Sequence, residues 1–196
     1  VMGLAPYGEP KYKNLIIKEL MDLKEDGSFK LNMKYFNYAT GLTMTNEKFS
    51  NLFGQPVRDP KKDLLTDFHM DIASSIQAVT EEVVLRLTKD IANEYKIKNL
   101  CLAGGVALNC VANGKILKEK YFQNIWIQPA AGDAGGSLGA ALAYWHRELD
   151  KPREDLKDKM KGAYLGPILK EDTIEKNLKS LKAVYTKKTS SEISKL

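Results

Sequence analysis

The chain has 196 residues, of which 43% are hydrophobic and 28% charged, a globular composition that excludes a disordered chain, a collagen-like repeat and a disulfide-stapled miniprotein. The net charge is only +5, and residues 147–196 mix 13 basic with 9 acidic side chains, which is typical of a solvated surface and argues against a nucleic-acid partner. No apolar run reaches the ~20 residues that span a bilayer, and no secretory signal opens the chain. We therefore expect no membrane partner.

Both ends of the chain predict a piece cut from a longer protein. Residues 1–8 are apolar and rich in turn formers, whereas a natural N-terminus is usually polar and loose. The other end, residues 190–196, stops inside what reads as the start of a helix. The alternative is a complete small protein with a processed start.

The first sixty residues predict a helix, a hairpin and a second short helix. Apolar residues recur at helical spacing over Lys11–Leu23, and they alternate loosely over Ser28–Tyr38, which indicates a strand or hairpin. Residues 45–53 predict a short helix that is capped by Thr45 or Asn46.

A long helix and an α/β alternation follow. Apolar residues recur at steps of three and four over Asp63–Tyr95, without an internal glycine or proline. Two short apolar runs, Leu100–Ala103 and Ile125–Ile127, read as strands, and each leads through a glycine-rich loop into a predicted helix, Asn109–Lys120 and Leu138–Trp145. This order predicts an α/β fold, in which ligands bind at the carboxyl ends of the strands.

The last fifty residues have a different character. Asp150–Lys161 is highly charged and predicts a linker, and Gly162–Leu169 and Ala183–Thr186 read as strands around a helix at Asp172–Leu181. This stretch is too short for a domain of its own and is expected to begin one.

The first glycine-rich loop is a candidate ligand site. Gly104 and Gly105 allow a positive φ and let a ligand approach the backbone, and the helix that follows starts with free N–H groups that favour an anion. Asn109, at the start of that helix, offers an amide to a sugar hydroxyl or a phosphate. The alternative is structural, with the glycines making a tight turn and Asn109 capping the helix.

The second loop, Gly132–Ser137, repeats the arrangement after the next strand. Its acidic residue is Asp133, which is either a helix cap or an oxygen ligand for a divalent metal. Because two such loops on successive strand ends would line one cleft, together they predict a nucleotide and metal site.

The histidines and cysteines add little to this site. His69 and His146 lie at helix ends without a matching partner nearby in sequence, so we expect surface or capping roles. Cys101 and Cys110 lack the spacing of a zinc site or a disulfide framework, so we expect a reducing cytoplasm. Cys101 is expected in the core, and Cys110 is expected to pack a helix.

Three motifs in this order resemble the O-carbamoyltransferases, which include nodulation-factor and antibiotic carbamoyltransferases. The motifs are MGLAPYG at Met2–Gly8, LAGGVALNCVANGKIL at Leu102–Leu117 and QPAAGDAGGSLGAAL at Gln128–Leu142. Asp71–Glu82 also fits the family, and GAYLGP at Gly162–Pro167 resembles the junction into its second domain.

The resemblance implies a partial actin-like ATPase (ribonuclease H-like) α/β domain, followed by the first elements of a second α/β domain. Residues 1–149 would be the C-terminal part of the carbamoyl-transfer domain, which is similar to the tRNA threonylcarbamoyl-transfer protein. Residues 150–161 would be the linker, and residues 162–196 would begin a domain similar to the threonylcarbamoyl-adenylate synthase.

The implied chemistry has two stages. Carbamoyl phosphate and ATP give a carbamoyl adenylate and pyrophosphate, and the carbamoyl group then passes to a hydroxyl of a sugar or other small acceptor as AMP leaves. The implied cofactors are ATP and a divalent metal of the iron type. The identity of the acceptor and the oligomeric state stay open.

The family's site residues map onto both loops. Asn109 matches the nucleotide-contacting Asn of the GGVxxN motif, and Asp133 matches the metal-binding Asp. The expected nucleotide-binding backbone comprises Gly104, Gly105, Val106, Gly135 and Gly136. The family's paired metal histidines, at HxxxH spacing, would lie before Val1, so we expect the isolated chain to be inactive, and we assign no catalytic residue within it.

Two other functions remain open. An actin-fold sugar or acyl kinase would transfer the γ-phosphoryl group of ATP and release ADP. A non-catalytic nucleotide-binding module would bind the nucleotide without a metal.

Overall fold

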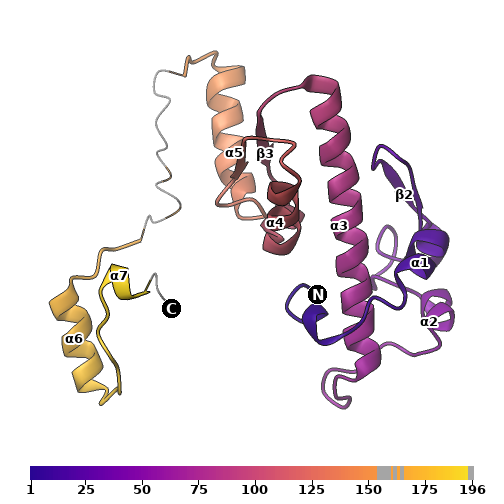
Figure 1. Ribbon diagram of the computed structural model, residues 1–196, viewed down its shortest axis with the longest axis horizontal. Coiled ribbons are helices and arrows are strands. Elements are labelled where there is room, and N and C mark those ends of the chain that lie inside the picture. The colour runs from indigo at the N-terminus through magenta and orange to yellow at the C-terminus, as the bar shows by residue number, and fades with distance from the viewer. Residues whose placement is uncertain (154–159, 161–162, 164–165, 194–196) are drawn as a thin grey trace. The chain divides into compact units, whose positions relative to one another are not determined.

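A computed structural model describes residues 1–153, 160, 163 and 166–193, and it divides the chain into two units, Val1–Pro152 and Arg153–Leu196. The described elements form a mixed α/β chain of helices and two small sheets (Figure 1).

The elements of the first unit are η1 (Ala5–Tyr7), α1 (Lys13–Leu15), η2 (Ile16–Leu20), β1 (Met21–Leu23), β2 (Phe29–Leu31), η3 (Met33–Tyr35), α2 (Glu47–Phe53), α3 (Asp67–Tyr95), β3 (Asn99–Leu102), η4 (Gly105–Leu108), α4 (Cys110–Glu119), β4 (Asn124–Ile127), α5 (Gly135–Ala143) and η5 (Tyr144–Glu148). Those of the second are α6 (Glu171–Ser180) and α7 (Ser190–Ile193).

The long helix α3 lies at the centre of the first unit, with α1, β2 and α2 on one side and β3 and α4 on the other (Figure 1). It starts four residues later than predicted, because Thr66 has an extended backbone at φ −123° and caps the helix. The Nδ1 atom of His69 accepts the Thr66 N–H at 3.1 Å, and the Thr66 hydroxyl lies 2.8 Å from the same Nδ1 atom. This reciprocal cap confirms the capping role predicted for His69.

The helix predicted over Lys11–Leu23 is wrong in its last turn. Helix α1 continues into the π-helical turn η2, after which Met21 is extended and β1 pairs antiparallel with β2, Met21 facing Leu31. Gly27, at φ +88°, makes the turn between the two strands. Residues 21–23 form a strand in spite of their helical spacing, because the pairing strand β2 lies only a few residues further along the chain.

The short helix α2 confirms its prediction. The Asn46 side chain accepts the backbone N–H groups of Lys48 and Phe49, and Gly54 ends the helix in the left-handed conformation at φ +70°. Phe53 of this helix joins a buried cluster with Ile16, Leu20, Met21, Tyr35, Val79 and Val83. The first sixty residues and one side of α3 therefore share this core.

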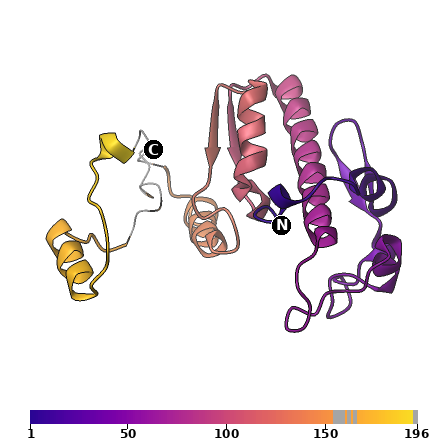
Figure 2. The ribbon, with the colours of Figure 1, turned by 60° about the horizontal axis from the view of Figure 1, so that its bottom comes forward.

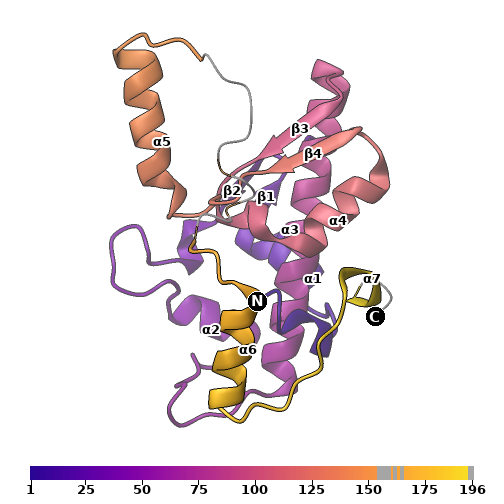
Figure 3. The same ribbon diagram turned by 90° about the vertical axis from the view of Figure 1, so that its left-hand side faces the viewer.

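Strands β3 and β4 pair parallel, with Leu100 facing Ile125 and Leu102 facing Ile127. Figure 2 and Figure 3 show the two strands side by side, next to α4 and α3. A second buried cluster joins Leu100, Ile116 and Phe122, against which Val84 and Leu85 of α3 pack. The predicted order of strand, glycine loop, helix and strand is confirmed here.

Helix α5 starts at Gly135, three residues earlier than predicted, and continues into the π-helical turn η5. None of its residues is buried. The Nδ1 atom of His146 in η5 lies 2.7 Å from the Lys151 carbonyl oxygen, so this histidine holds the end of the helical segment, as predicted.

The described part of the second unit contains α6, which confirms the helix predicted at Asp172–Leu181, and α7. Residues 166–169 and 183–186 form no strand, in contrast to the prediction, while residues 162, 164 and 165 lie outside the described part. Much of the predicted linker, residues 154–159 and 161, also lies outside it. Lys187 returns to α6 and pairs with Glu171 and Glu175, each at 2.9 Å.

Within the described residues, no helix has both the length and the apolar character needed to cross a membrane.

Candidate functional site

The two glycine-rich loops meet at the carboxyl ends of β3 and β4. The Gly104 N–H donates to the Ala131 carbonyl at 2.8 Å, and the Gln128 N–H donates to the Leu102 carbonyl at 3.1 Å. Ala131 is buried. The structure thus brings together the two loops that the sequence predicted to line one cleft, at the edge where α/β folds bind ligands.

The first loop has a backbone that only glycine adopts readily. Gly104 has φ +98° and ψ 160°, a combination that is strained for any residue with a Cβ atom. A Cβ added at Gly104 or Gly105 would contact nothing, so the space beside both residues is open. Among the described residues, the N–H groups of Gly105 and Val106 have no backbone acceptor. The loop therefore presents two free donors next to open space, which suits an anion or a polar ligand atom.

Asn109 closes the first loop and caps α4. Its Oδ1 atom accepts the Ala112 N–H at 3.1 Å, which confirms the structural role left open above. The same side chain also forms two hydrogen bonds with Gln77 of α3, at 2.9 and 3.2 Å. Asn113 is held separately, because its Nδ2 donates to the Ala107 carbonyl at 2.7 Å.

Gln77 was not predicted as a site residue. It is buried on α3, next to Glu81 one turn further along, and its Nε2 donates to the Glu81 carboxylate at 2.8 Å. Glu81 is also buried and pairs with Lys115 of α4. A polar side chain at a core-facing position of the predicted long helix is the signal in the sequence that could have identified them, but α3 also buries Asp71, Ser75 and Thr88, so the signal is not specific.

The second loop closes on itself. The N–H groups of Gly135 and Gly136 donate to the carbonyls of Gly132 and Asp133, at 3.0 and 3.1 Å. A Cβ at Gly135 would lie 2.0 Å from the Ala130 carbonyl oxygen, so this glycine is required by the turn itself. The two N–H groups expected to bind the nucleotide are therefore engaged within the loop, in contrast to those of Gly105 and Val106.

Asp133 is exposed on this second loop. Its carboxylate has no hydrogen-bond or ion-pair partner among the described residues. That makes it available to a ligand and removes the alternative of a helix cap, since α5 has no side-chain cap. The residues that the structure describes contain no cluster of three or more His, Cys, Asp or Glu able to hold a metal.

The structure corrects the prediction that Cys101 lies in the core. Cys101 and Cys110 are both exposed. Strand alternation explains Cys101, because its neighbours Leu100 and Leu102 point toward the second cluster and Cys101 points to the other face. Cys110 lies at the start of α4, where its Sγ atom is 3.8 Å from the Met2 Sδ atom.

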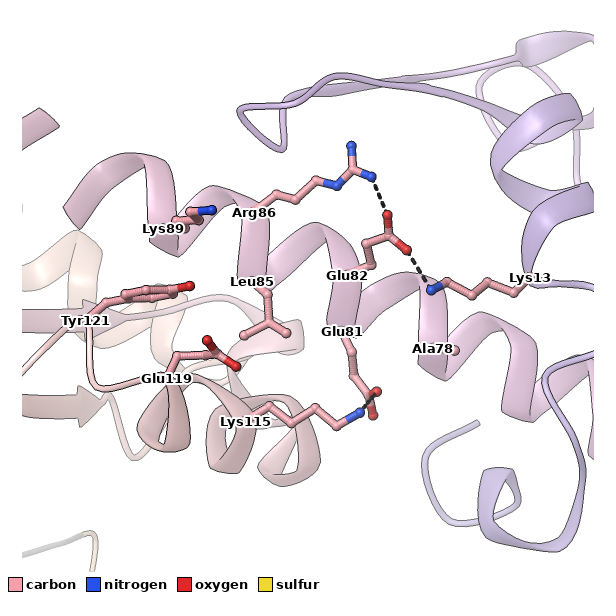
Figure 4. Close-up of a pocket in the computed structure, with 10 residues that line it drawn as sticks. All are labelled: Lys13, Ala78, Glu81, Glu82, Leu85, Arg86, Lys89, Lys115, Glu119 and Tyr121. Carbon is pink, nitrogen blue, oxygen red and sulfur yellow. Dashed lines mark hydrogen bonds and ion pairs between the residues drawn. The ribbon is translucent and has the colours of Figure 1, made fainter. Parts of the chain in front are cut away.

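A cavity of about 410 Å³ opens between α3 and α4 and is lined mainly by charged side chains (Figure 4). Lys13 bonds Glu82 at 2.7 Å, and Arg86 pairs with the same carboxylate. The Lys13 ammonium, with smaller help from Arg86, holds the pKa of the Glu82 carboxyl below its ordinary value. A second, mostly apolar cavity of about 280 Å³ lies beside the first loop and is lined in part by Ala103 and Val106.

Comparison with known proteins places this site in context. Residues 1–142 match the family described as carbamoyltransferase N-terminus. The chain is 62% identical over 188 residues to an uncharacterized protein of Synechocystis sp., covering 94% of this chain and 30% of that protein. It is 36% identical over 174 residues to nodulation protein NolNO of Sinorhizobium fredii, covering 88% of this chain and 23% of that protein.

A more distant similarity joins the chain to a tRNA N6-adenosine threonylcarbamoyltransferase of Prochlorococcus marinus, at 29% identity over 148 residues. It covers 74% of this chain and 38% of that protein. The chain thus spans less than two fifths of the length of each of these relatives.

Proposed function

The chain belongs to the carbamoyltransferase family, and from that premise we propose that it forms part of the nucleotide- and metal-binding domain of an O-carbamoyltransferase. The proposed substrates are carbamoyl phosphate, ATP and a small molecule that bears a hydroxyl group. Water first cleaves carbamoyl phosphate into carbamate and phosphate; a carbamate oxygen then attacks the α-phosphorus of ATP, which forms carbamoyl adenylate and releases pyrophosphate. The acceptor hydroxyl oxygen then attacks the carbamoyl carbon, the bond to the adenylate phosphate breaks, and AMP leaves.

The observation that carries this proposal is the contact between the loops, Gly104 N–H to Ala131 carbonyl at 2.8 Å. Because the two loops touch, this contact supports one shared site for the free N–H groups of Gly105 and Val106 and the Asp133 carboxylate. A nucleotide phosphate needs donors and a divalent cation needs oxygen ligands, so the two loops supply complementary halves of one site.

In this proposal the loops have separate tasks. Gly105, Val106 and Asn109 bind the nucleotide through backbone and amide donors, and Gly104 shapes the first loop, because its own N–H is bonded to the Ala131 carbonyl. Gly135 and Gly136 shape the second loop, because their own N–H groups are already bonded within it.

Asp133 fits the role of one metal ligand, since its carboxylate is exposed and has no partner among the described residues. A bound divalent metal of the iron type would act as a Lewis acid on the carbamoyl or phosphate oxygen. We expect histidines from outside residues 1–196 to complete its ligand set.

The fold implied by the proposal is a partial actin-like ATPase domain in residues 1–149, a linker, and the start of a second α/β domain from residue 162. The similarity to a threonylcarbamoyltransferase supports this assignment, and so does the parallel pairing of β3 and β4 with ligand-facing loops at their carboxyl ends.

The test uses the full-length protein with ATP labelled at the α-phosphate, carbamoyl phosphate and a panel of hydroxylated acceptors. In the presence of carbamoyl phosphate and an acceptor, we expect labelled AMP together with unlabelled pyrophosphate. Release of ADP would identify a kinase instead and would overturn the proposal. Residues 1–196 expressed alone are expected to show no turnover.

Asp133→Ala tests the metal half of the site. We expect the variant to lose its metal by elemental analysis and to lose most of its transfer activity. The matched control is Asp90→Ala on α3, since Asp90 is also exposed and without a partner among the described residues. Nucleotide affinity and metal content that are both unchanged in Asp133→Ala would indicate a non-catalytic nucleotide-binding module.

A further inference from the structure

A buried pair of amides links the first loop to α3. The Asn109 Nδ2 donates to the Gln77 Oε1 at 2.9 Å, and the Gln77 Nε2 donates back to the Asn109 Oδ1 at 3.2 Å. Gln77 is only 7% exposed, whereas Asn109 is half-buried. The two side chains thus hold each other face to face across residues that lie 32 positions apart in the chain.

The direction of this pair is fixed at both ends. Ionised Glu81 can only accept hydrogen bonds, so the Gln77 amide must turn its Nε2 toward the Glu81 carboxylate, 2.8 Å away. The backbone N–H of Ala112 can only donate, so Asn109 must turn its Oδ1 toward it. Neither amide can flip without facing donor to donor or acceptor to acceptor.

Lys115 holds the Glu81 carboxylate in place. The Lys115 ammonium pairs with the second carboxylate oxygen of Glu81, which is only 8% exposed (Figure 4). The other carboxylate oxygen of Glu81 is left to accept from the Gln77 Nε2.

This chain of contacts leaves Asn109 with one unused polar group. Its Oδ1 already accepts from Ala112 and Gln77, and one N–H of its Nδ2 donates to Gln77. The other N–H has no acceptor among the residues that the structure describes. Asn109 can therefore offer a ligand a donor but no free acceptor.

We infer that Gln77 is a positioning residue, which together with Glu81 and Lys115 locks the Asn109 amide so that it donates to an acceptor atom of the bound nucleotide. This inference rests on the proposed function, and it specifies the polarity of the contact. A phosphate oxygen, a ribose oxygen or an unprotonated ring nitrogen satisfies it, whereas a group that only donates does not.

The test is a double-mutant cycle on ATP affinity, measured by calorimetry in the full-length protein. Gln77→Met keeps an unbranched side chain of similar length in the buried site but removes the amide. Asn109→Ser keeps an oxygen that caps α4 but removes the amide N–H groups, and its shorter side chain ends before the position of the amide nitrogen. We expect each single variant to weaken ATP binding about tenfold, the loss typical of one hydrogen bond to a charged group.

The double variant decides the question. If Gln77 acts through Asn109, Gln77→Met costs no further affinity in the Asn109→Ser background. Two losses that multiply to about a hundredfold would overturn the inference and leave the proposed function intact. Absence of ATP binding by the wild-type protein would overturn the proposed function and this inference with it.

Two further variants separate positioning from loss of fold. Thr88→Val, the matched control, removes a buried hydroxyl on the same helix that bonds only α3 carbonyls, and ATP affinity is expected to stay unchanged. Lys115→Met acts one step further out on a half-exposed side chain. We expect it to weaken ATP binding a few-fold in wild type and not at all in Asn109→Ser; equal losses in both backgrounds would contradict the positioning role.

Discussion

The two faces of α3 differ in what holds them to the rest of the first unit. On the hairpin face, Val79 and Val83 join a large buried cluster with residues of the first sixty positions. On the loop face, Val84 and Leu85 pack on a smaller cluster. Beside it, the buried side chain of Gln77 bonds Asn109, and that of Glu81 pairs with Lys115 of α4. The hairpin face combines this large cluster with hydrogen bonds from the Glu9 and Tyr12 N–H groups to Asp71 and Ser75, whereas the loop face combines a smaller cluster with an amide pair that leads to the candidate site.

This difference shows how a single helix can serve both purposes. Apolar packing has no direction, so it fixes the distance between elements but not the orientation of a polar group. A hydrogen-bonded amide fixes orientation but contributes little net stability. Because both kinds of contact lie side by side on α3, the cluster can hold α4 in place while Gln77 orients the Asn109 side chain.

The largest expected effect tests whether the smaller cluster on the loop face is a true core. Ile116 is fully buried there, so Ile116→Ala should lower the free energy of unfolding by about 4 kcal/mol, from lost transfer energy and the cavity left behind. Ile116→Val, which removes one methyl group, should cost about 1 kcal/mol. Both are measured by urea unfolding of the full-length protein.

The contrast between the two faces would be wrong if Ile116→Ala lowered the free energy of unfolding less than Val83→Ala on the hairpin face does. Such a result would mean that the smaller cluster collapses around the deletion and that polar contacts, not packing, hold α4 to α3.

The next effect tests the second loop. Gly135→Ala would place a Cβ 2.0 Å from the Ala130 carbonyl oxygen, so the loop must shift, at a cost of about 2 kcal/mol in the free energy of unfolding. The matched control is Gly136→Ala, where an added Cβ meets nothing and the stability should change by less than about 1 kcal/mol. Equal stabilities of the two variants in thermal unfolding would show that the second loop shifts its backbone without cost, and that it does not hold Gly104 in a fixed position.

Local patterns in the sequence predicted most of the elements of the first unit. The spacing of apolar residues marked α3, α4 and both strands of the parallel pair, because helix and strand periodicity are properties of neighbouring residues. The start of α3 was misplaced because the cap at Thr66 depends on one reciprocal contact with His69. The strand at Met21–Leu23 was missed because it exists only through its partner.

The candidate site was predictable only in part, for the same reason. Glycines after a strand and before a helix mark a loop that approaches a ligand, so Gly104, Gly105 and Asn109 stood out. The bonds that engage Gly135 and Gly136 within their own loop depend on backbone geometry that composition does not carry. Gln77 was missed since its partner Asn109 lies 32 residues away, and only the folded chain brings the two together.

The smallest expected effect concerns the ion pair between Glu82 of α3 and Lys13 of α1, next to the hairpin face. Glu82 bonds Lys13 at 2.7 Å and pairs with Arg86 (Figure 4), and the Lys13 ammonium, more than Arg86, lowers its pKa in the folded state. A carboxyl group whose pKa is lower in the folded than in the unfolded state adds stability above its unfolded pKa of about 4.3. That stability is lost as the pH falls through the lowered pKa of the folded state. Glu82→Gln should therefore cost up to about 1 kcal/mol at pH 7, since the pair is partly exposed, and the difference from wild type should shrink and then vanish as the pH falls through the lowered pKa of the folded state.

Urea unfolding from pH 7 down to about pH 3 measures this difference, with Glu94→Gln as the matched control. Glu94 lies on the same helix, is exposed and has no partner among the described residues, so its substitution should leave the pH dependence unchanged. A Glu82→Gln difference that stays constant with pH would show that the lost contribution is side-chain packing and not charge. The expected loss of stability for Glu82→Gln is only a fraction of that for Ile116→Ala. The buried clusters therefore contribute most of the free energy that holds both faces of α3, and the ion pair between Glu82 and Lys13 adds a small, directional contribution on the side of α1.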